Sequence, residues 1–268
     1  MIKIKKTFLA MTLLMTASYS NAGLLTIEIN DNGGLSESQY SLFNEASTLW
    51  STFLTGVQSA ADHLLTINAS GLDIDGQGGV LGRAGPSRAR VDSELGYAYA
   101  TQGVMEFDRA DLDKLESDGK LFDVILHEIS HAMGYGSLWN TDSFGGVFAG
   151  TQSVYADGTG RYTGRYALDV YKKEFDPDAT YIPVELDGGE GTADSHWDEA
   201  WAGGSNEVLT GYLGSNTYLS DTSIASFADI GYTTIVTHPQ DSSAVSVSAP
   251  ATLGLFSLSL LVAFRRRK

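Results

Sequence analysis

The folds open to this chain are limited above all by two histidines, His127 and His131, which stand four positions apart with Glu128 between them. They lie in residues 120–133, the strongest helical pattern of the sequence, with a predicted buried stripe of Leu121, Val124, Ile125, Ile129 and Met133. Histidines at this spacing share one face of a helix and can bind one cation. Glu128 can then contact a water at an open position of that metal. The motif predicts a catalytic zinc site on a largely buried helix.

The composition narrows the class of protein further. The 268 residues are 43% hydrophobic and 19% charged, which suits a packed globular domain. The chain has 17 basic and 33 acidic residues, and seven of the basic residues lie in the first six and last four positions. The rest of the chain carries 10 basic against 33 acidic residues, a balance of −23 that argues against a nucleic-acid partner. The absence of cysteine excludes disulfide scaffolds, thiolate zinc sites and cysteine nucleophiles.

The first 22 residues are typical of a secretory signal peptide. Three lysines precede an apolar run over residues 8–17, and small residues precede a cleavage point before Gly23. The run is much shorter than the roughly 20 residues that span a bilayer. We therefore expect an exported protein.

The opposite end carries a second targeting pattern. A Ser-rich linker, 237–248, leads to an apolar run over residues 251–264 and four basic residues, 265–268. Residues 249–268 resemble the PEP-CTERM sorting tails of Gram-negative bacteria, with Ser248-Ala249-Pro250 in place of the Pro-Glu-Pro core. The resemblance implies transient membrane contact, recognition by export and sorting machinery, and delivery to the cell surface or the extracellular space. A plain tail anchor is the alternative.

Residues 23–236 are predicted to form one α+β domain. The predicted strands are 24–30, 63–68, 80–84 and 103–108, and the predicted helices are 36–54, 110–116, 120–133, 165–175 and 223–230. Ser36 and Gln39 have the spacing of a capping box, and Gly134 can end the zinc-site helix in the left-handed conformation. We expect a twisted mixed sheet backed by the first and third of these helices. This N-terminal subdomain would end near residue 135, and an irregular C-terminal subdomain would follow.

A zinc site with an open position needs a third protein ligand. The remaining histidines are His63, His196 and His238. His63 opens a predicted strand and His238 lies in the terminal linker, so both are expected at the surface. His196 lies in a loop-like segment beside Trp197, which could shield a metal, and its residue type favours it. Carboxylates that could serve instead are Glu174, Glu185 and Asp194.

Residues 127–136 (HEISHAMGYG) fit H-E-x-x-H-x-x-G, the opening motif of the metzincin zinc proteases. Most metzincins place a third histidine three residues after that glycine, where this chain has Ser137. The leishmanolysin branch carries a long insertion there, and this chain resembles bacterial leishmanolysin-like proteases over roughly residues 24–235. The resemblance rests on VLGRAGP (80–86), GVMEFD (103–108), DVILHEISHAMGYGSLW (123–139), IPVELDGGEGTADSHWDEA (182–200) and NEVLTGYL (206–213).

This resemblance implies a metzincin-like fold and an exported zinc-dependent endopeptidase. The implied zinc ligands are His127, His131 and His196, and the implied general base is Glu128. It also implies that the strand at 80–84 is a sheet edge above the cleft. There Gly82 and Ala84 would bind a protein or peptide substrate by strand addition.

One departure from the family concerns the floor of the site. The methionine that metzincins carry beneath the metal is replaced by Leu209, which is apolar and similar in volume. Glu207 nearby is interpreted either as a residue that orients a ligand or as a solvated turn residue. A catalytically silent surface or matrix protein that keeps the fold for binding is the alternative function.

The sequence supports a calcium site less strongly than it supports the zinc site. Asp73–Gly76 begins like a calcium loop, but the twelfth position of such a loop is Ala84 and lacks the required glutamate. We interpret Asp73–Gly76 as a turn. Ca²⁺ binding at other acidic positions is left open.

Overall fold

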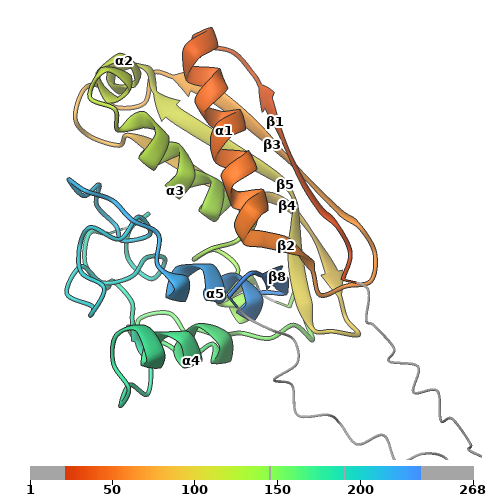
Figure 1. Cartoon of the computed structure of the whole chain (residues 1–268). Coiled ribbons are helices and arrows are strands. Elements are labelled where there is room, and N and C mark those ends of the chain that lie inside the picture. The colour runs from red at the N-terminus through yellow and green to blue at the C-terminus, as the bar shows by residue number, and fades with distance from the viewer. Residues whose placement is uncertain (1–21, 145, 190, 237–268) are drawn as a thin grey trace, which may run out of the picture. The chain divides into compact units, whose positions relative to one another are not determined.

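The computed structural model describes residues 22–144, 146–189 and 191–236 (Figure 1). The predicted signal peptide apart from its last residue, the predicted linker and the predicted sorting tail lie outside the described residues. None of the helices formed by the described part of the chain combines the length and the apolar character needed to cross a membrane.

A four-stranded mixed sheet forms the scaffold of the N-terminal half. Its strands, in spatial order, are β1 (Leu25–Asp31), β3 (His63–Leu72), β5 (Tyr97–Asp108) and β4 (Gly82–Asp92). β1, β3 and β5 run parallel, and β4 pairs with β5 in the antiparallel direction. Burial alternates along β3, so one face of the sheet points into the core and the other toward solvent. The predicted α+β class and mixed sheet are thus confirmed.

Two helices cover the core-facing side of this sheet (Figure 1). Helix α1 (Glu37–Phe53) begins with the predicted capping box, in which the side chains and backbone N–H groups of Ser36 and Gln39 pair reciprocally. Helix α3 (Leu121–Met133) packs against α1, β4 and β5 and ends at Gly134, whose φ of 115° is the predicted left-handed cap. Both helix predictions are confirmed to within a residue.

Helix α3 packs directly on β5 at Gly103. A Cβ at Gly103 would lie 2.9 Å from the Cβ of Ala132 in α3, closer than real Cβ contacts. Trp50 of α1 donates from its indole N–H to the carbonyl of Leu126 at 2.9 Å, which fixes the two helices relative to each other. The helix that carries the two histidines is therefore held from both sides.

The C-terminal half, which we take as the described residues after 135, has little regular structure. Its elements are a 3₁₀ turn η1 (Thr141–Phe144), β6 (Arg161–Tyr162), α4 (Arg165–Glu174), β7 (Ile182–Pro183), α5 (Asp221–Asp229) and β8 (Tyr232–Thr234). Helices α4 and α5 cap each other: Glu174 accepts a hydrogen bond from the N–H of Thr222 at 2.9 Å, and Asp229 accepts one from the N–H of Ala167 at 2.9 Å. This arrangement compensates for the absence of a side-chain cap at Gly164, the residue before α4.

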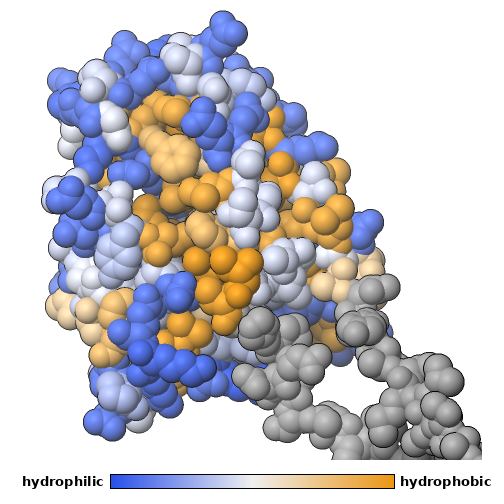
Figure 2. All heavy atoms as spheres, in the orientation of Figure 1, coloured by the Kyte–Doolittle hydropathy of each residue, from blue (hydrophilic) through white to orange (hydrophobic). Residues whose placement is uncertain are grey.

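The two halves join through strand pairing and aromatic packing. β8 pairs in the antiparallel direction with β2 (Leu54–Val57), which directly follows α1. Trp50 of α1 packs against Phe227 of α5 with ring centroids 4.9 Å apart. On the face shown in Figure 2, apolar residues gather between the hydrophilic regions around α2 (Arg109–Ser117) and α4.

Several strand boundaries differ from the predictions. The strand predicted over residues 80–84 instead begins at Gly82 and continues to Asp92. It passes through Pro86, which is compatible with the edge position of β4 in the sheet. β3 and β5 are also longer than predicted, because pairing with a neighbouring strand extends each beyond its apolar segment.

The prediction of a surface position for His63 is wrong. His63 is 2% exposed, and its Nε2 lies 2.7 Å from the carbonyl oxygen of Ala100 in β5. The residue begins β3 on the core-facing side, where the strand alternation buries it. Burial lowers the pKa of this imidazole below its usual value.

Candidate metal centre and the cleft around it

Three histidine side chains meet at the boundary of the two halves. His127 and His131 lie on one face of α3, and His196 comes from the irregular segment between β7 and α5. The Nε2 atoms of His127 and His131 are 3.0 Å apart. The Nε2 atom of His196 lies 3.1 Å from that of His127 and 2.9 Å from that of His131. The group can hold a metal ion. Zn–N bonds of about 2.0–2.1 Å in a tetrahedral site separate ligand nitrogens by roughly 3.3 Å, close to the spacing found here.

The other nitrogen of each ring is held by a backbone carbonyl. His127 Nδ1 lies 2.7 Å from the oxygen of Val208, His131 Nδ1 lies 3.1 Å from that of Tyr135, and His196 Nδ1 lies 2.8 Å from that of Thr192. These contacts set the orientation of all three rings. A carbonyl only accepts, so each Nδ1 must carry the hydrogen. In a neutral ring the lone pair is then on Nε2, and three lone pairs converge with no donor among them. Three lone pairs that face one another repel, and a cation bound between them would accept all three.

The protonation state of the histidines also suits a metal. Burial lowers the pKa of His127, lowers that of His131 well below the usual value and, with the nearby His127, brings that of His196 to about 3. Lowered pKa values favour neutral imidazoles at physiological pH. Neutral imidazole nitrogen is a preferred ligand of zinc.

Glu128 lies next to the first histidine and is 6% exposed. Burial raises the pKa of this carboxyl to about 8. A cation bound to the neighbouring histidines would favour the carboxylate form. The start of β4 passes close by, because a Cβ at Gly82 would lie 3.3 Å from the Cγ of Glu128. A Cβ there would also lie 3.2 Å from the ring of Phe107, so a larger residue would require these side chains to shift by a few tenths of an ångström.

A cleft of about 1010 Å³ contains the histidines and Glu128. One wall is formed by the segment that leads into β4 and by the first residues of that strand, including the predicted substrate-binding residues Gly82 and Ala84. The segments around residues 191–196 and 208–214 also line the cleft. Since β4 is the last strand of its sheet, its outer backbone groups have no strand partner in the described part of the chain.

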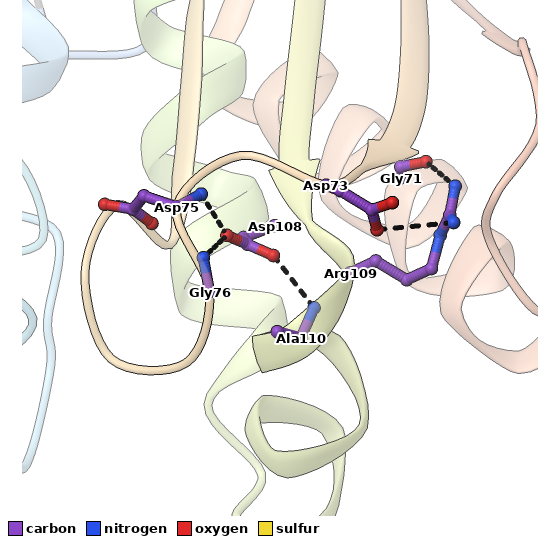
Figure 3. A network of polar contacts seen from close by, with 7 residues as sticks. All are labelled: Gly71, Asp73, Asp75, Gly76, Asp108, Arg109 and Ala110. Atoms are coloured by element: carbon purple, nitrogen blue, oxygen red, sulfur yellow. Dashed lines mark hydrogen bonds and ion pairs between the residues drawn. The ribbon is translucent and has the colours of Figure 1, made fainter.

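The loop between β3 and β4 is fastened to the start of α2 by two buried carboxylates, Asp108 and Asp111, of which Figure 3 shows Asp108. Asp108 accepts hydrogen bonds from the N–H groups of Asp75 at 2.8 Å, Gly76 at 2.7 Å and Ala110 at 2.9 Å. Chiefly through the Ala110 bond, this network lowers the pKa of Asp108 to about 2. Asp111 accepts from the N–H of Gly78 at 2.9 Å. Residues 74 and 75 form a bend, and the turn of this loop lies two residues later, at 77 and 78, rather than at 73–76 as predicted. The hydrogen bonds of Asp108 and Asp111 to the loop, here called the carboxylate clasp, hold one wall of the cleft.

Glu207 supports a histidine indirectly. It is 1% exposed, which excludes the solvated-turn interpretation, and burial raises its pKa to about 7. Its carboxyl oxygens accept from the N–H of Leu209 at 2.6 Å and from the N–H of Ser220 at 3.0 Å. These bonds fix the turn whose Val208 carbonyl faces His127. Leu209 itself is fully buried, and its carbonyl accepts from the hydroxyl of Tyr135 at 3.1 Å.

The three carboxylates considered as alternative ligands are occupied elsewhere. Glu174 caps α5, Glu185 accepts from the N–H of Asp187 at 2.5 Å, and Asp194 accepts from the N–H of Gly158 at 2.7 Å. Within the described ranges, the histidine triad is the one group of three potential ligands with converging atoms. His238 lies outside the described residues. The spatial convergence therefore favours His196 over the carboxylates.

Comparison with known proteins assigns the chain to no family. No model of a known protein family matches the chain, and no curated protein is significantly similar to it. The leishmanolysin-like resemblance thus continues to rest on its sequence motifs.

Sequence reasoning missed the carbonyl groups of Val208, Tyr135 and Thr192 that orient the rings. Main-chain acceptors leave no residue-type signal, so no pattern could have indicated them. The acidic residue at the end of β5, Asp108, did carry a signal as the N-cap of the following helix. Its second role, in fastening the loop before β4, depends on tertiary structure.

Proposed function

We propose that this chain is an exported zinc-dependent endopeptidase with a metzincin-like fold. The observation that carries the proposal is the convergence of three carbonyl-oriented Nε2 atoms beside a buried glutamate in an open cleft. Three neutral imidazoles are a typical protein ligand set of catalytic zinc, in which a fourth position stays open. When bound, zinc would polarise the scissile carbonyl and lower the pKa of a water in that position.

Glu128 is the proposed general base. It directly follows the first proposed ligand on α3, and its side chain lines the same cleft as the three histidines, which supports this role. As a carboxylate it takes a proton from the attacking water and passes it to the leaving amine nitrogen. Its burial shields this proton transfer from bulk solvent.

The edge strand β4 is the proposed substrate platform. Gly82 and Ala84 line the cleft at the start of this strand. An extended peptide could pair with their backbone groups by strand addition, which aligns one peptide bond with Glu128. This mode of binding suits a protein or peptide substrate and depends little on side-chain identity.

The place of action is proposed from the ends of the sequence. The signal-like residues 1–22 and the PEP-CTERM-like residues 249–268 support export to the surface of a Gram-negative bacterium or beyond it. The strong acidic excess of the intervening chain favours solubility there.

Cleavage of a protein substrate tests the proposal. Purified zinc-loaded protein is incubated with casein beside its Glu128→Gln variant, and zinc content is measured for both. We expect the variant to retain zinc and to lose activity by about 10²–10⁴-fold, because only the base is removed. Equal cleavage by both proteins would contradict the role of Glu128. A folded, zinc-bound wild type that cleaves neither casein nor unstructured peptides would support a catalytically silent binding protein, an alternative favoured by Leu209 at the usual methionine position.

A further inference from the structure

Asp194 has an unusual backbone conformation close to the third histidine. It is the one non-glycine residue with a positive φ in the described part of the chain, at 64°. Residues with a Cβ seldom adopt this conformation, although aspartate and asparagine tolerate it better than most. Asp194 precedes His196 by two residues, so its backbone direction influences where the imidazole points.

The side chain of Asp194 is anchored to a separate segment of the C-terminal half. Its Oδ1 accepts hydrogen bonds from the hydroxyl of Tyr155 and from the N–H of Gly158, the latter at 2.7 Å. Tyr155 is only 4% exposed and packs against Trp139, with ring centroids 6.1 Å apart. The Tyr155 side of the anchor is therefore part of the core, whereas Gly158 lies in an exposed turn.

The main chain at Asp194 and at His196 is paired with Glu185. The N–H of Asp194 donates to the carbonyl of Glu185 at 2.8 Å, and the N–H of Glu185 donates to the carbonyl of His196 at 2.9 Å. The ring of His196 is in turn oriented by the carbonyl of Thr192. The conformation at Asp194 thus determines how the chain passes from Thr192 to His196.

We propose that Asp194 is a positioning residue for the third metal ligand. Its carboxylate, held by Tyr155 and Gly158, stabilises the left-handed turn that aims His196 at the two helix histidines. The inference rests on the proposed metal site, but it assigns Asp194 no place in the coordination sphere. It follows that Asp194 raises metal affinity by reducing the number of conformations that the loop must give up when the metal binds.

Substitutions at this position separate its two contributions. Asp194→Asn keeps an acceptor oxygen and a residue that tolerates the left-handed conformation. Asp194→Gly keeps the conformation but loses the anchor, and Asp194→Ala loses both. Tyr155→Phe removes one donor to the carboxylate while keeping the ring that packs on Trp139. Asp198→Ala is the matched control, because Asp198 follows His196 by two residues and its Oδ1 binds only a local N–H, that of Ala200 at 2.7 Å.

The test is the affinity of the metal-free full chain for Zn²⁺, measured by competition with a chromophoric chelator. Relative to wild type, we expect a loss of about 10–100-fold for Asp194→Ala, the range typical of residues that orient metal ligands. Asp194→Gly should show a smaller loss, whereas Asp194→Asn and Asp198→Ala should stay within about threefold. Tyr155→Phe should weaken binding in wild type and have a smaller effect in Asp194→Ala, where the contact between the two side chains is already lost. A residual effect in Asp194→Ala would reflect the second bond of the Tyr155 hydroxyl, which accepts from the N–H of Gly160 at 3.2 Å.

The proposal and the metal site can fail separately. If Asp194→Ala folds and binds Zn²⁺ as tightly as Asp198→Ala, the positioning role is wrong. If Asp194→Ala does not fold, unchanged affinity in both Asp194→Gly and Tyr155→Phe leads to the same conclusion.

If Asp194→Asn loses Zn²⁺ while His196→Ala retains it, Asp194 is a ligand and the proposal is overturned. If wild type binds no tighter than His131→Ala, the metal site itself is absent and this inference falls with it. Thermal unfolding without metal confirms that each affinity is measured on folded protein.

Discussion

The metal centre joins two regions that position their ligands in different ways. His127 and His131 are fixed by the periodicity of α3, a regular helix packed against the sheet and against α1. His196 lies in a segment without regular structure, where single contacts through Glu185 and Thr192 fix its backbone and its ring. In the first region local sequence sets the spacing of the two ligands, although the distant carbonyl of Val208 orients the ring of His127. In the second region no helix fixes the backbone, and Asp194 is held by Tyr155, 39 residues away. We therefore expect the second region to be the more sensitive to substitutions away from the metal.

Removing a ligand from either region should have the largest effect. We expect His131→Ala and His196→Ala each to reduce Zn²⁺ affinity by more than about 100-fold, beyond the 10–100-fold typical of residues behind the ligands. Chelator competition measures both values. An unchanged affinity in His196→Ala would show that the irregular region contributes no ligand. It would contradict the view that both regions build the metal centre.

The aromatic support of the irregular region should have the next largest effect. Trp197 is fully buried, stacks on Trp139 with centroids 5.0 Å apart, and donates from its indole N–H to the hydroxyl of Ser223 at 2.8 Å. Trp197→Ala should therefore lower the free energy of unfolding by about 3–5 kcal/mol, the usual cost of truncating a buried aromatic side chain. Denaturant titration measures this change. Ile129→Val, a single-methyl deletion in α3, is the control on the helix side and should cost about 1 kcal/mol.

A smaller effect is expected at the turn that orients His127. Glu207→Gln replaces one of two accepting oxygens with an NH₂ group, so the N–H of Leu209 or of Ser220 loses its partner. The unpaired buried group should lower the free energy of unfolding by about 1–3 kcal/mol. Zn²⁺ affinity should also fall, because the neighbouring Val208 carbonyl orients His127. The exposed Glu45→Gln on α1 is the matched control, and equal stability of the two variants would contradict the supporting role of Glu207.

The smallest effect concerns the carboxylate clasp on the sheet side of the cleft. The pKa of Asp108 is about 2 in the folded protein, against 3.8 for an unperturbed aspartate, mainly because backbone N–H groups stabilise its charged form. Its contribution to stability is therefore fully present above about pH 4 and is lost as the pH falls toward 2. The melting temperature of wild type should exceed that of Asp108→Asn by a constant amount from pH 7 to pH 5. That difference should narrow below pH 4, and an unchanged difference at pH 3 would exclude a charge-based clasp.

The regular region was largely predictable from sequence. The capping box at Ser36, the glycine stop at Gly134 and the apolar stripe of α3 are local signals, and the structure follows each of them. Strand lengths were underestimated because pairing between neighbours, as in the long β4–β5 ladder, is not encoded locally. The same limitation led to the wrong placement of His63 at the surface.

The irregular region was predictable only in part. The residue type of His196 and its motif pointed to the third ligand, and the structure brings its Nε2 to the other two. The environment of that ligand was not predictable, because it consists of main-chain acceptors and of a left-handed aspartate held by a tyrosine 39 residues away. A sequence gives residue identities at a site, whereas contacts between distant segments set their orientation.

The pairing of β2 with β8 determines at what stage of folding the two halves of the domain can join. All three histidines of the triad precede β8. Apart from a single bridge between Val57 and Gly23, β2 has no strand partner among the described residues until Tyr232–Thr234 are available. A chain that emerges from its N-terminus would therefore carry every metal ligand before it could complete the contacts that join its two halves. Long-range pairing of this kind slows folding, because the intervening loop must be ordered first. Assembly of the centre is thus coupled to the last strand of the domain, and truncation just before residue 232 should leave an incompletely folded chain with all of its ligands.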